Sequence, residues 1–357
     1  MNKKYYSVST LKQLCRAIFE AAGVPPNEAE VVSDSLLWAN LRGIDSHGVS
    51  RVPVYVARIK NGLVSPKASY KVVNENKVIT VLDGGNSLGQ IIALEAVAMG
   101  INKAKDSGVG ICAVRNTNHV GMLAYYTSRI AEQGYIGIAF SNAPPAMAPW
   151  GGRKPMLGTN PISFAVPAGK YGAVILDMAT STVARGKIRE AAAEGKAIPP
   201  DWALDREGRV TTDPGEALKG ALFPLGGAKG YGLALMADIF SGVLTGAAYC
   251  DLITPMYLDN FRGEEKRNIG NFICVLNINT FLPLKEFIMR MEDQCFRLKD
   301  SPKAEGITEI YLPGEIEEIR MRERLTTGIP LGEKTVAKLL ELACQAGVKN
   351  TLCEEVQ

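Results

Sequence analysis

The sequence predicts an α/β fold with a helical segment at each end of the chain. Apolar side chains recur at helical spacing in the first 60 residues and again over 334–346, whereas β-branched runs alternate with helical runs between residues 77 and 177. The apolar content of 46% and the charged content of 22% are ordinary for a globular chain of 357 residues. This length allows two domains, or one large domain with a helical extension.

Three helices are predicted near the N-terminus, and they cover residues 10–22, 27–41 and 52–59. Ser9 is expected to cap the first helix, and Asn27 with Glu30 is expected to form a capping box at the start of the second. The polar stretch 45–48 follows the end of the second helix, and a rigid helix holds such a site well.

Strands and helices then alternate. The predicted strands cover residues 77–82, 109–114, 135–141, 162–166, 174–177, 272–278 and 307–312. The predicted helices cover 93–104, 121–133, a stretch through 186–188, 233–244 and 334–346. The helix over 233–244 is apolar except for Asp238 and is expected to be buried in the core. The Gly- and Pro-rich segment 142–160 is predicted to be a functional loop, and 195–221 an irregular polar segment.

Composition excludes several functional classes. The formal net charge is only +3 and there is no Lys/Arg-rich run, so nucleic acid is not an expected partner. No apolar run is long enough for a membrane span, and no signal-peptide pattern follows the N-terminus, so a cytoplasmic location is expected. The seven cysteines form no CxxC pair and the two histidines are far apart, so we expect no metal site.

The two histidines, His47 and His119, are the candidates for acid–base chemistry. Both lie in polar segments bounded by glycines, and His47 is accompanied by Ser46 and Arg51. Histidine is the side chain that exchanges a proton most readily near neutral pH. His119 is predicted at a strand-to-helix junction, where backbone N–H groups can receive an anion. The alternative is a histidine in a surface loop or a buried histidine satisfied by a hydrogen bond, but Ser, His and Arg together favour a site for an oxyacid.

The usual nucleotide-binding fingerprints do not occur. No Gly-x-Gly-x-x-Gly follows a strand, and no Gly-x-x-x-x-Gly-Lys-Ser/Thr is present. The stretch 226–230 combines glycines with Lys229 before a helix, which suits a phosphate or pyrophosphate. Glycines at such a place also serve packing, and this pattern alone leaves both interpretations open.

In combination, the motifs resemble those of the type-2 malate/L-lactate dehydrogenase family. This family includes malate, sulfolactate and ureidoglycolate dehydrogenases, 2,3-diketogulonate reductase and cyclic-imine reductases. The matching motifs extend from about residue 9 to about residue 335, and they are Asp45-Ser46-His47-Gly48 with Arg51, Asn118-His119-x-Gly121, Gly158-Thr159-Asn160-Pro161, Asp177-Met178-Ala179-Thr180-Ser181, Gly186-Lys187, Gly226-Gly227-x-Lys229-Gly230-Tyr231-Gly232 and Pro313-Gly314-Glu315.

The resemblance implies a non-Rossmann NAD(P)-binding domain on a mixed or largely antiparallel sheet. It implies that a helical segment over 1–75, carrying Ser46, His47 and Arg51, packs with a C-terminal helix over 330–357, and that residues 76–329 form the NAD(P)-binding and catalytic α/β region. It also implies a homodimer or a higher homo-oligomer. The segment 251–271 departs from the family pattern because it is shorter and lacks the usual Gly-His before the late strand, so the resemblance does not extend to a cofactor or interface contact from it.

The resemblance also assigns roles to individual residues. It implies NAD or NADP as the cofactor, bound by Ser141, Asp177, Met178, Ala179, Lys229, Gly230 and Glu315. It implies a substrate site formed by Ser46, Arg51 and Thr159, with His119 and His47 as the catalytic residues.

The function expected from these residues is reversible hydride transfer between a small 2-hydroxy acid and its 2-oxo acid. Arg51 can pair with the substrate carboxylate, and a histidine can take and return the hydroxyl proton. We favour His119 as the acid–base and His47 as the group that binds or polarises the substrate oxygen. The alternatives are a reductase of a cyclic imine carboxylate or a diketo sugar acid, and a non-enzymatic protein that binds small acids or nucleotides. The sequence leaves open which acid is used and whether NAD or NADP is preferred.

Overall fold

A seven-stranded mixed sheet organises the fold. The computed structural model describes residues 4–256, 266–349 and 352. The strand order is β2-β3-β4-β10-β5-β6-β7, in which β3 and β4 are parallel and every other neighbouring pair is antiparallel. The strands are β2 (Lys71–Glu75), β3 (Ile79–Asp83), β4 (Val109–Thr117), β5 (Tyr135–Ser141), β6 (Ile162–Pro167), β7 (Ala173–Met178) and β10 (Ile269–Asn277). The predicted mixed sheet is confirmed.

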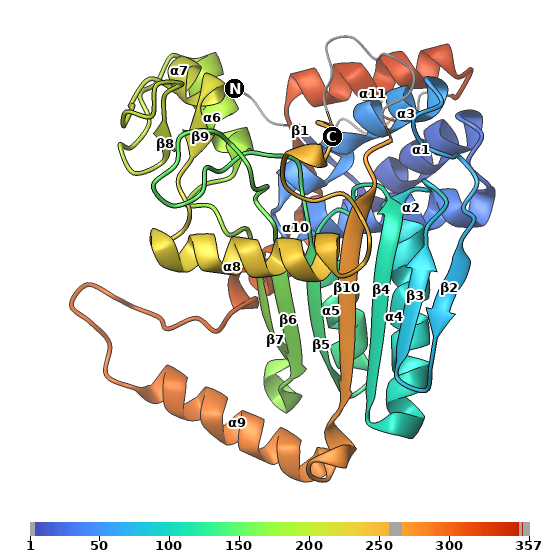
Figure 1. The fold of residues 1–357 in the computed structure, drawn as a ribbon, viewed down its shortest axis with the longest axis vertical. Helices are drawn as coiled ribbons and strands as arrows, with labels where there is room; N and C mark the ends of the chain where they lie inside the picture. The colour runs from blue at the N-terminus through green and yellow to red at the C-terminus, as the bar shows by residue number, and fades with distance from the viewer. Residues whose placement is uncertain (1–3, 257–265, 350–351, 353–357) are drawn as a thin grey trace.

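Two helices cover one face of this sheet, α4 (Gly89–Ser107) and α5 (Ala124–Glu132) (Figure 1). Their apolar side chains meet those of the central strands in a buried cluster that includes Leu82, Ile92, Val114, Tyr126 and Ile273. Gly108 caps the C-terminal end of α4, and its left-handed φ of 79° suits glycine. Helix α5 begins at Ala124, later than the predicted start at residue 121.

A second core joins the two ends of the chain. It is formed mainly by α1 (Val8–Ala21), α2 (Pro26–Leu41), α3 (Val52–Lys60) and α11 (Glu333–Gln345). Beside them, β1 (Lys4–Tyr6) pairs with β11 (Ile329–Leu331). The N- and C-terminal helical segments therefore pack together, whereas the division of the chain into domains at the expected boundaries stays a prediction.

Both predicted helix caps in this region are wrong. The cap of α1 is Ser7, whose Oγ accepts a hydrogen bond from the Thr10 backbone N–H at 3.2 Å. Helix α2 begins with Pro26, and no side chain caps it. Glu30 lies instead 2.7 Å from Lys12 in an ion pair between α1 and α2. Pro25 and Pro26 have no backbone N–H, so this helix start has fewer unpaired donors for side chains to satisfy.

The predictions for the later part of the chain are partly wrong. The segment 195–221 contains α7 (Pro214–Lys219) and a small ribbon of β8 (Ala203–Leu204) and β9 (Ala221–Leu222), which lie beside α6 (Arg185–Glu194). The stretch 307–312 forms no strand. It lies between two helices that were not predicted, α9 (Leu284–Asp300) and α10 (Glu315–Thr327). Within the described residues, no helix has the length and apolar character that a membrane span requires.

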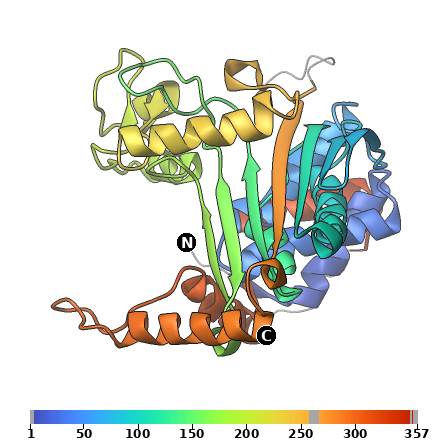
Figure 2. The ribbon, with the colours of Figure 1, turned by 60° about the horizontal axis from the view of Figure 1, so that its bottom comes forward.

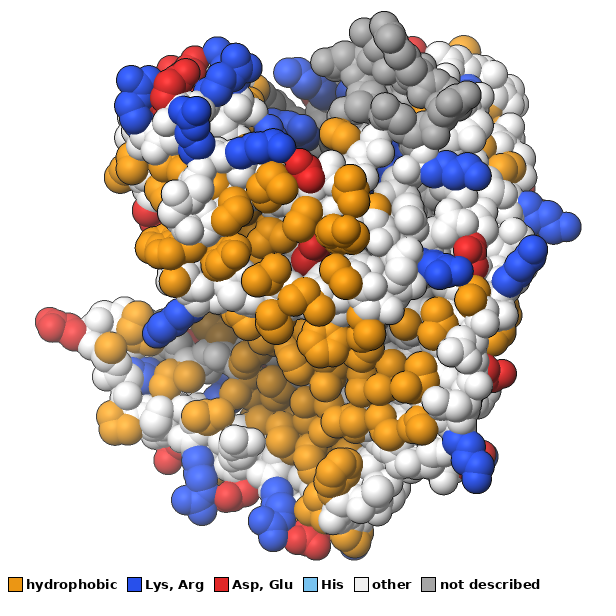
Figure 3. Space-filling view, viewed as in Figure 1, with side chains coloured by type: hydrophobic (Ala, Val, Ile, Leu, Met, Phe, Trp, Pro, Cys, Tyr) orange, Lys and Arg blue, Asp and Glu red, His pale blue; other side chains and the backbone are white. Residues whose placement is uncertain are grey.

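Helix α8 (Ala228–Asp238) and the π-helical turn over 239–243 cross the other face of the sheet (Figures 1 and 2). The expectation of a fully buried helix is wrong here. Leu233, Met236 and Val243 are 43%, 46% and 54% exposed. Figure 3 shows that apolar side chains cover this helix and continue onto the neighbouring sheet face. One broad apolar surface of the chain is therefore open to solvent, and we call it the α8 face.

Candidate active site

The sheet pairing brings the predicted site residues to one edge. Strands β4, β5 and β7 end at the edge where β6 and β10 begin, because β10 is antiparallel to β4 and β5, and β6 is antiparallel to β7. His119 follows the end of β4, Ser141 is the last residue of β5, and Met178 is the last residue of β7. Ser141 lies opposite Asn271 at the start of β10.

The two histidines stack against each other. Their ring centroids are 5.5 Å apart and the ring planes differ by 27°. His47 lies in a short 3-10 turn over Asp45–His47, where the Ser46 Oγ is 3.1 Å from its Nδ1. The two motifs, separated by about seventy positions in the sequence, therefore meet in a single place.

Arg51 lies beside the stacked histidines. Its Nε donates a hydrogen bond to the Ser46 carbonyl oxygen at 2.6 Å, and its Nη1 is 3.4 Å from the Met256 sulfur. The guanidinium charge has an electrostatic effect on both rings. Burial lowers the pKa of His47 to about 3, with a further contribution from Arg51. Burial followed by the charge of Arg51 also holds the pKa of His119 well below its usual range. Both histidines are therefore neutral at pH 7.

His119 is held by residues that the sequence analysis missed. The Tyr55 hydroxyl lies 2.6 Å from its Nδ1, and the Gln90 Nε2 donates a hydrogen bond to the Tyr55 oxygen at 3.1 Å. Tyr55 lies in the first turn of α3, four residues after Arg51, which directly precedes this helix, so a helical spacing from Arg51 could have identified it. Gly89 lets α4 approach, because a Cβ there would lie 2.3 Å from the Asn118 carbonyl oxygen.

The pocket at His119 also contains a cation from the segment 251–271. Arg267 is 2% exposed, and its Nε donates a hydrogen bond to the Thr254 carbonyl oxygen at 3.1 Å. Its charge contributes to lowering the pKa of His119. The described ends of this segment therefore contribute to the pocket at His119, whereas its lack of a cofactor or interface contact stays a prediction, and residues 257–265 lie outside the described residues. The pocket is lined by Tyr55, Arg58, Val64, Leu88, Asn118, His119, Met256 and Arg267.

The shape of the Ser46–His47 turn depends on Asp45. Its two carboxylate oxygens accept hydrogen bonds from the Arg324 guanidinium at 2.7 and 3.1 Å, and one of them also accepts from the Asn40 Nδ2 at 2.6 Å. Asn40 in turn accepts a hydrogen bond from the Val49 backbone N–H at 2.8 Å. Gly48 is needed because a Cβ there would lie 2.0 Å from the Asn40 Oδ1. The acidic and glycine positions of the motif are thus structural supports for its serine and histidine.

Replacing Arg324 with Met is expected to lower kcat/KM about tenfold to a hundredfold, because a small misplacement of a site residue is costly. The change removes the bidentate partner of Asp45 and frees the turn that carries His47. Steady-state kinetics and urea unfolding measure the effect. Arg322→Met is the matched control, since Arg322 is 78% exposed on the same helix and its ion pair with Glu318 contributes about 0–1 kcal/mol. Equal kinetics for the two variants would contradict the positioning role.

The segment after β7 connects two further motifs. The Thr180 backbone N–H donates a hydrogen bond to the Thr159 carbonyl oxygen, and the Leu225 N–H donates to the Thr180 carbonyl oxygen, both at 2.9 Å. Thr159 and the loop before α8 therefore lie on either side of this segment. Gly226 and Gly227 have φ values of 59° and 70°, which suit glycine, and the exposed start of α8 follows them. The substrate role of Thr159 stays a prediction.

Two acidic residues expected at the cofactor have protein partners. The Asp177 carboxyl group accepts a hydrogen bond from the Ala124 backbone N–H at 2.8 Å, so the acceptor at the start of α5 is a side chain of the protein. Burial raises the pKa of Asp177 to about 7. Glu315, the first residue of α10, binds the Lys299 ammonium through both oxygens, at 2.7 and 2.9 Å. Their cofactor roles stay predictions.

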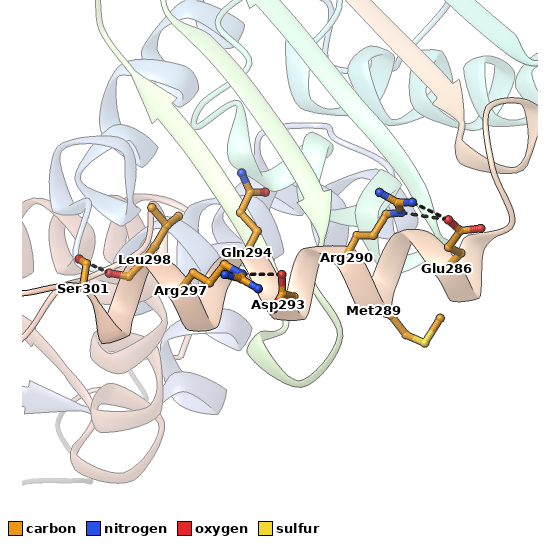
Figure 4. A pocket seen from close by; sticks show the side chains of 8 residues that line it. All are labelled: Glu286, Met289, Arg290, Asp293, Gln294, Arg297, Leu298 and Ser301. Atoms are coloured by element: carbon orange, nitrogen blue, oxygen red, sulfur yellow. Dashed lines mark hydrogen bonds and ion pairs between the residues drawn. The ribbon is translucent and has the colours of Figure 1, made fainter.

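A hollow of about 850 Å³ along α9 lies away from this site. It is lined by one helix and Ser301, and its charged side chains pair with each other, as Glu286 with Arg290 and Asp293 with Arg297 (Figure 4). Helix α9 follows the other end of β10, at the opposite edge of the sheet (Figure 1). The described part of the chain holds no cluster of three or more potential metal ligands.

Comparison with known proteins identifies the family. The family described as malate/L-lactate dehydrogenase matches residues 6–340. A protein named malate dehydrogenase from Pyrococcus horikoshii is 40% identical over 335 residues, which are 92% of this chain and 91% of that protein. A protein named ureidoglycolate dehydrogenase (NAD(+)) from Escherichia coli is 33% identical over 325 residues, 91% of this chain and 92% of that protein.

A solved structure agrees with these matches. The sulfolactate dehydrogenase from Methanocaldococcus jannaschii superposes with a TM-score of 0.90 at 37% identity, and the match covers 97% of this chain and 98% of that one. The resemblance of the motifs is thereby confirmed. The sequence and the fold, each matched over more than nine tenths of the chain, show that this protein belongs to the malate/L-lactate dehydrogenase family.

Proposed function

We propose that the protein is an NAD(P)-dependent dehydrogenase that interconverts a small 2-hydroxy acid and its 2-oxo acid by reversible hydride transfer. The observation that carries the proposal is the stacked pair of His47 and His119 beside Arg51. A guanidinium binds a carboxylate, and a neutral imidazole accepts a proton, so the two halves of a hydroxy acid each have a partner. The names of the relatives, which specify malate and ureidoglycolate, support this substrate class.

In this proposal, Arg51 and Arg267 bind the substrate carboxylate, and Ser46 donates a hydrogen bond to the carboxylate or carbonyl oxygen. During oxidation, the substrate O–H bond breaks and an N–H bond forms on His119, which becomes an imidazolium. During reduction, the same proton returns to the substrate oxygen. The lowered pKa of His119 keeps it neutral in the free protein, as a base requires.

We propose NAD or NADP as the cofactor, held at the sheet edge by Ser141, Met178, Ala179, Lys229 and Gly230. The chain fits such a group because Gly226, Ala228 and Lys229 are exposed at the start of α8, and the N-terminus of a helix attracts phosphate. The Escherichia coli relative has NAD(+) in its name. When bound, the nicotinamide ring accepts or supplies the hydride.

The test is a substrate screen that follows the loss of absorbance of the reduced nicotinamide, with NADH and NADPH measured separately. The panel contains the oxo acids of malate, lactate, sulfolactate and ureidoglycolate, together with a cyclic imine carboxylate and a diketo sugar acid. Oxidation of the reduced cofactor by a 2-oxo acid supports the proposal. Turnover of the imine alone would make the protein an imine reductase, and cofactor binding without any turnover would make it a binding protein.

We further propose that the chain forms a homodimer or a higher homo-oligomer through the α8 face. A contiguous apolar surface of this kind is typical of an interface between subunits. Leu233, Met236 and Val243 follow helical spacing on one side of α8 and its π-helical turn, and each is more than 40% exposed. The cytoplasmic location stays a prediction.

Met236→Glu is expected to convert the oligomer to a monomer, because it would bury a carboxylate in an apolar contact. Light scattering after size exclusion should give at least twice 38.4 kDa for the wild type and 38.4 kDa for the variant. Val210→Glu is the control, since Val210 is 59% exposed in the segment between β8 and α7 and its change should leave the mass unaltered. A monomeric wild-type protein would refute the proposal.

A further inference from the structure

We propose that Gln90, which lies outside the predicted substrate site, determines through the Tyr55 hydroxyl which ring nitrogen of His119 carries the hydrogen. Gln90 is then a positioning residue, and it acts on the candidate acid–base without touching the substrate. The consequence for catalysis rests on the proposed function, whereas the effect on the imidazole does not.

The three side chains form a row inside the protein. Gln90 and Tyr55 are 0% and 3% exposed, and they come from the first turn of α4 and from α3. The Gln90 Nε2 lies 3.1 Å from the Tyr55 oxygen, which lies 2.6 Å from the His119 Nδ1. The Gln90 Oε1 is buried and has no hydrogen-bond partner among the described residues. Rotation of the amide would place this acceptor oxygen where the donor Nε2 now lies.

The direction of the hydrogen bonds follows from the amide. With Nε2 toward Tyr55, the amide donates and the Tyr55 hydroxyl hydrogen points to the His119 Nδ1. Neutral His119 then carries its hydrogen on Nε2, which is unable to accept a proton. Rotating the amide by half a turn presents Oε1 instead, so the hydroxyl donates to Gln90 and the Nδ1–H of His119 donates to Tyr55. The His119 Nε2 then carries no hydrogen and is able to accept a proton.

Glutamine suits this position because it can both donate and accept. The rotated arrangement is the one that serves proton transfer. In oxidation, the substrate O–H bond breaks and the Nε2–H bond forms, while Nδ1–H keeps its bond to Tyr55, and reduction reverses these steps. An ionised Glu at position 90 can only accept and so holds the rotated arrangement, whereas Met neither donates nor accepts. The two substitutions therefore predict different imidazole tautomers.

The chain has two histidines, so nitrogen NMR of protein labelled with ¹⁵N-histidine reads each ring directly, and a His47→Gln variant assigns the signals. Above neutral pH and without substrate, wild-type His119 is expected to show a protonated Nε2 and a bare Nδ1. In Gln90→Glu, His119 is expected to show a protonated Nδ1 and a bare Nε2 instead. An unchanged His119 spectrum would overturn the proposal. The readout needs no turnover, so it is independent of whether the proposed reaction is found.

Three further variants test the route. In a Tyr55→Phe background, Gln90→Glu is expected to leave His119 unchanged, and a tautomer change there would show that Tyr55 is not the connection. Gln90→Met is expected to give a mixture of tautomers, which keeps the test available if the glutamate variant does not fold. A wild-type spectrum for Gln90→Met would also overturn the proposal. Gln133→Glu, the same exchange at an exposed residue at the end of α5, is expected to have no effect.

Discussion

Replacing His119 with Gln is expected to lower kcat by about 10²- to 10⁴-fold, the usual contribution of a positioned acid–base. The reduced nicotinamide cofactor should bind with nearly its wild-type affinity, because no predicted cofactor contact is removed. His119 is favoured as the acid–base since its Nδ1 is fixed by the buried Tyr55, whereas the Nδ1 of His47 contacts the exposed Ser46. Steady-state kinetics and a fluorescence titration of NAD(P)H separate the two effects.

His47→Gln is the matched comparison. This variant is expected to raise KM with a smaller loss of kcat, because His47 is assigned to the substrate oxygen rather than to the proton. A nearly normal kcat in His119→Gln together with an inactive His47→Gln enzyme would exchange the two roles. Both rings have a lowered pKa and lie 5.5 Å apart, so the pKa values alone do not distinguish them.

Hydrophobic periodicity predicts those helices and strands that are determined by neighbouring residues in the sequence. The strand over 135–141 was predicted with the bounds that β5 has, and the helix expected over 334–346 is α11. Hydrophobic periodicity does not indicate which distant strands pair. The mixed sheet and the common site of the two histidines are therefore predicted only through the resemblance of the motifs. The structure agrees with both.

The remaining errors have a common physical cause, which is that the partner lies far away in the sequence. The apolar residues of 307–312 suggest a strand, but no strand among the described residues pairs with this stretch, and Ile307 and Tyr311 are about half exposed. Helix α8 is largely apolar around its circumference, and a single sequence does not distinguish a helix buried in the core from one with an exposed apolar side. Arg324 meets Asp45 across 279 positions, and nothing near either residue predicts the pair.

Arg51→Met is expected to lower kcat/KM about a hundredfold, because losing a charged hydrogen-bonding partner costs about 3 kcal/mol. Arg51 is assigned, together with Arg267, to the substrate carboxylate, and after burial its charge further lowers the pKa of both histidines. Arg16→Met is the control, since Arg16 is 46% exposed on α1 and pairs with Glu20. Its kinetics should match those of the wild type.

The position of Arg51 beside the two histidines predicts that substrate binding is linked to proton uptake. A bound carboxylate neutralises Arg51, so the pKa of His47 rises from about 3 and that of His119 rises from its lowered value. Binding of an unreactive 2-oxo acid analogue should therefore take up protons, and its affinity should fall as the pH rises through the pKa of the complex. Calorimetry in buffers of different ionisation enthalpy measures this uptake. In Arg51→Met the proton uptake should be smaller, because without that charge the pKa values of the two histidines are less lowered before the acid binds. An equal uptake in both proteins would contradict the assignment of Arg51 to the carboxylate.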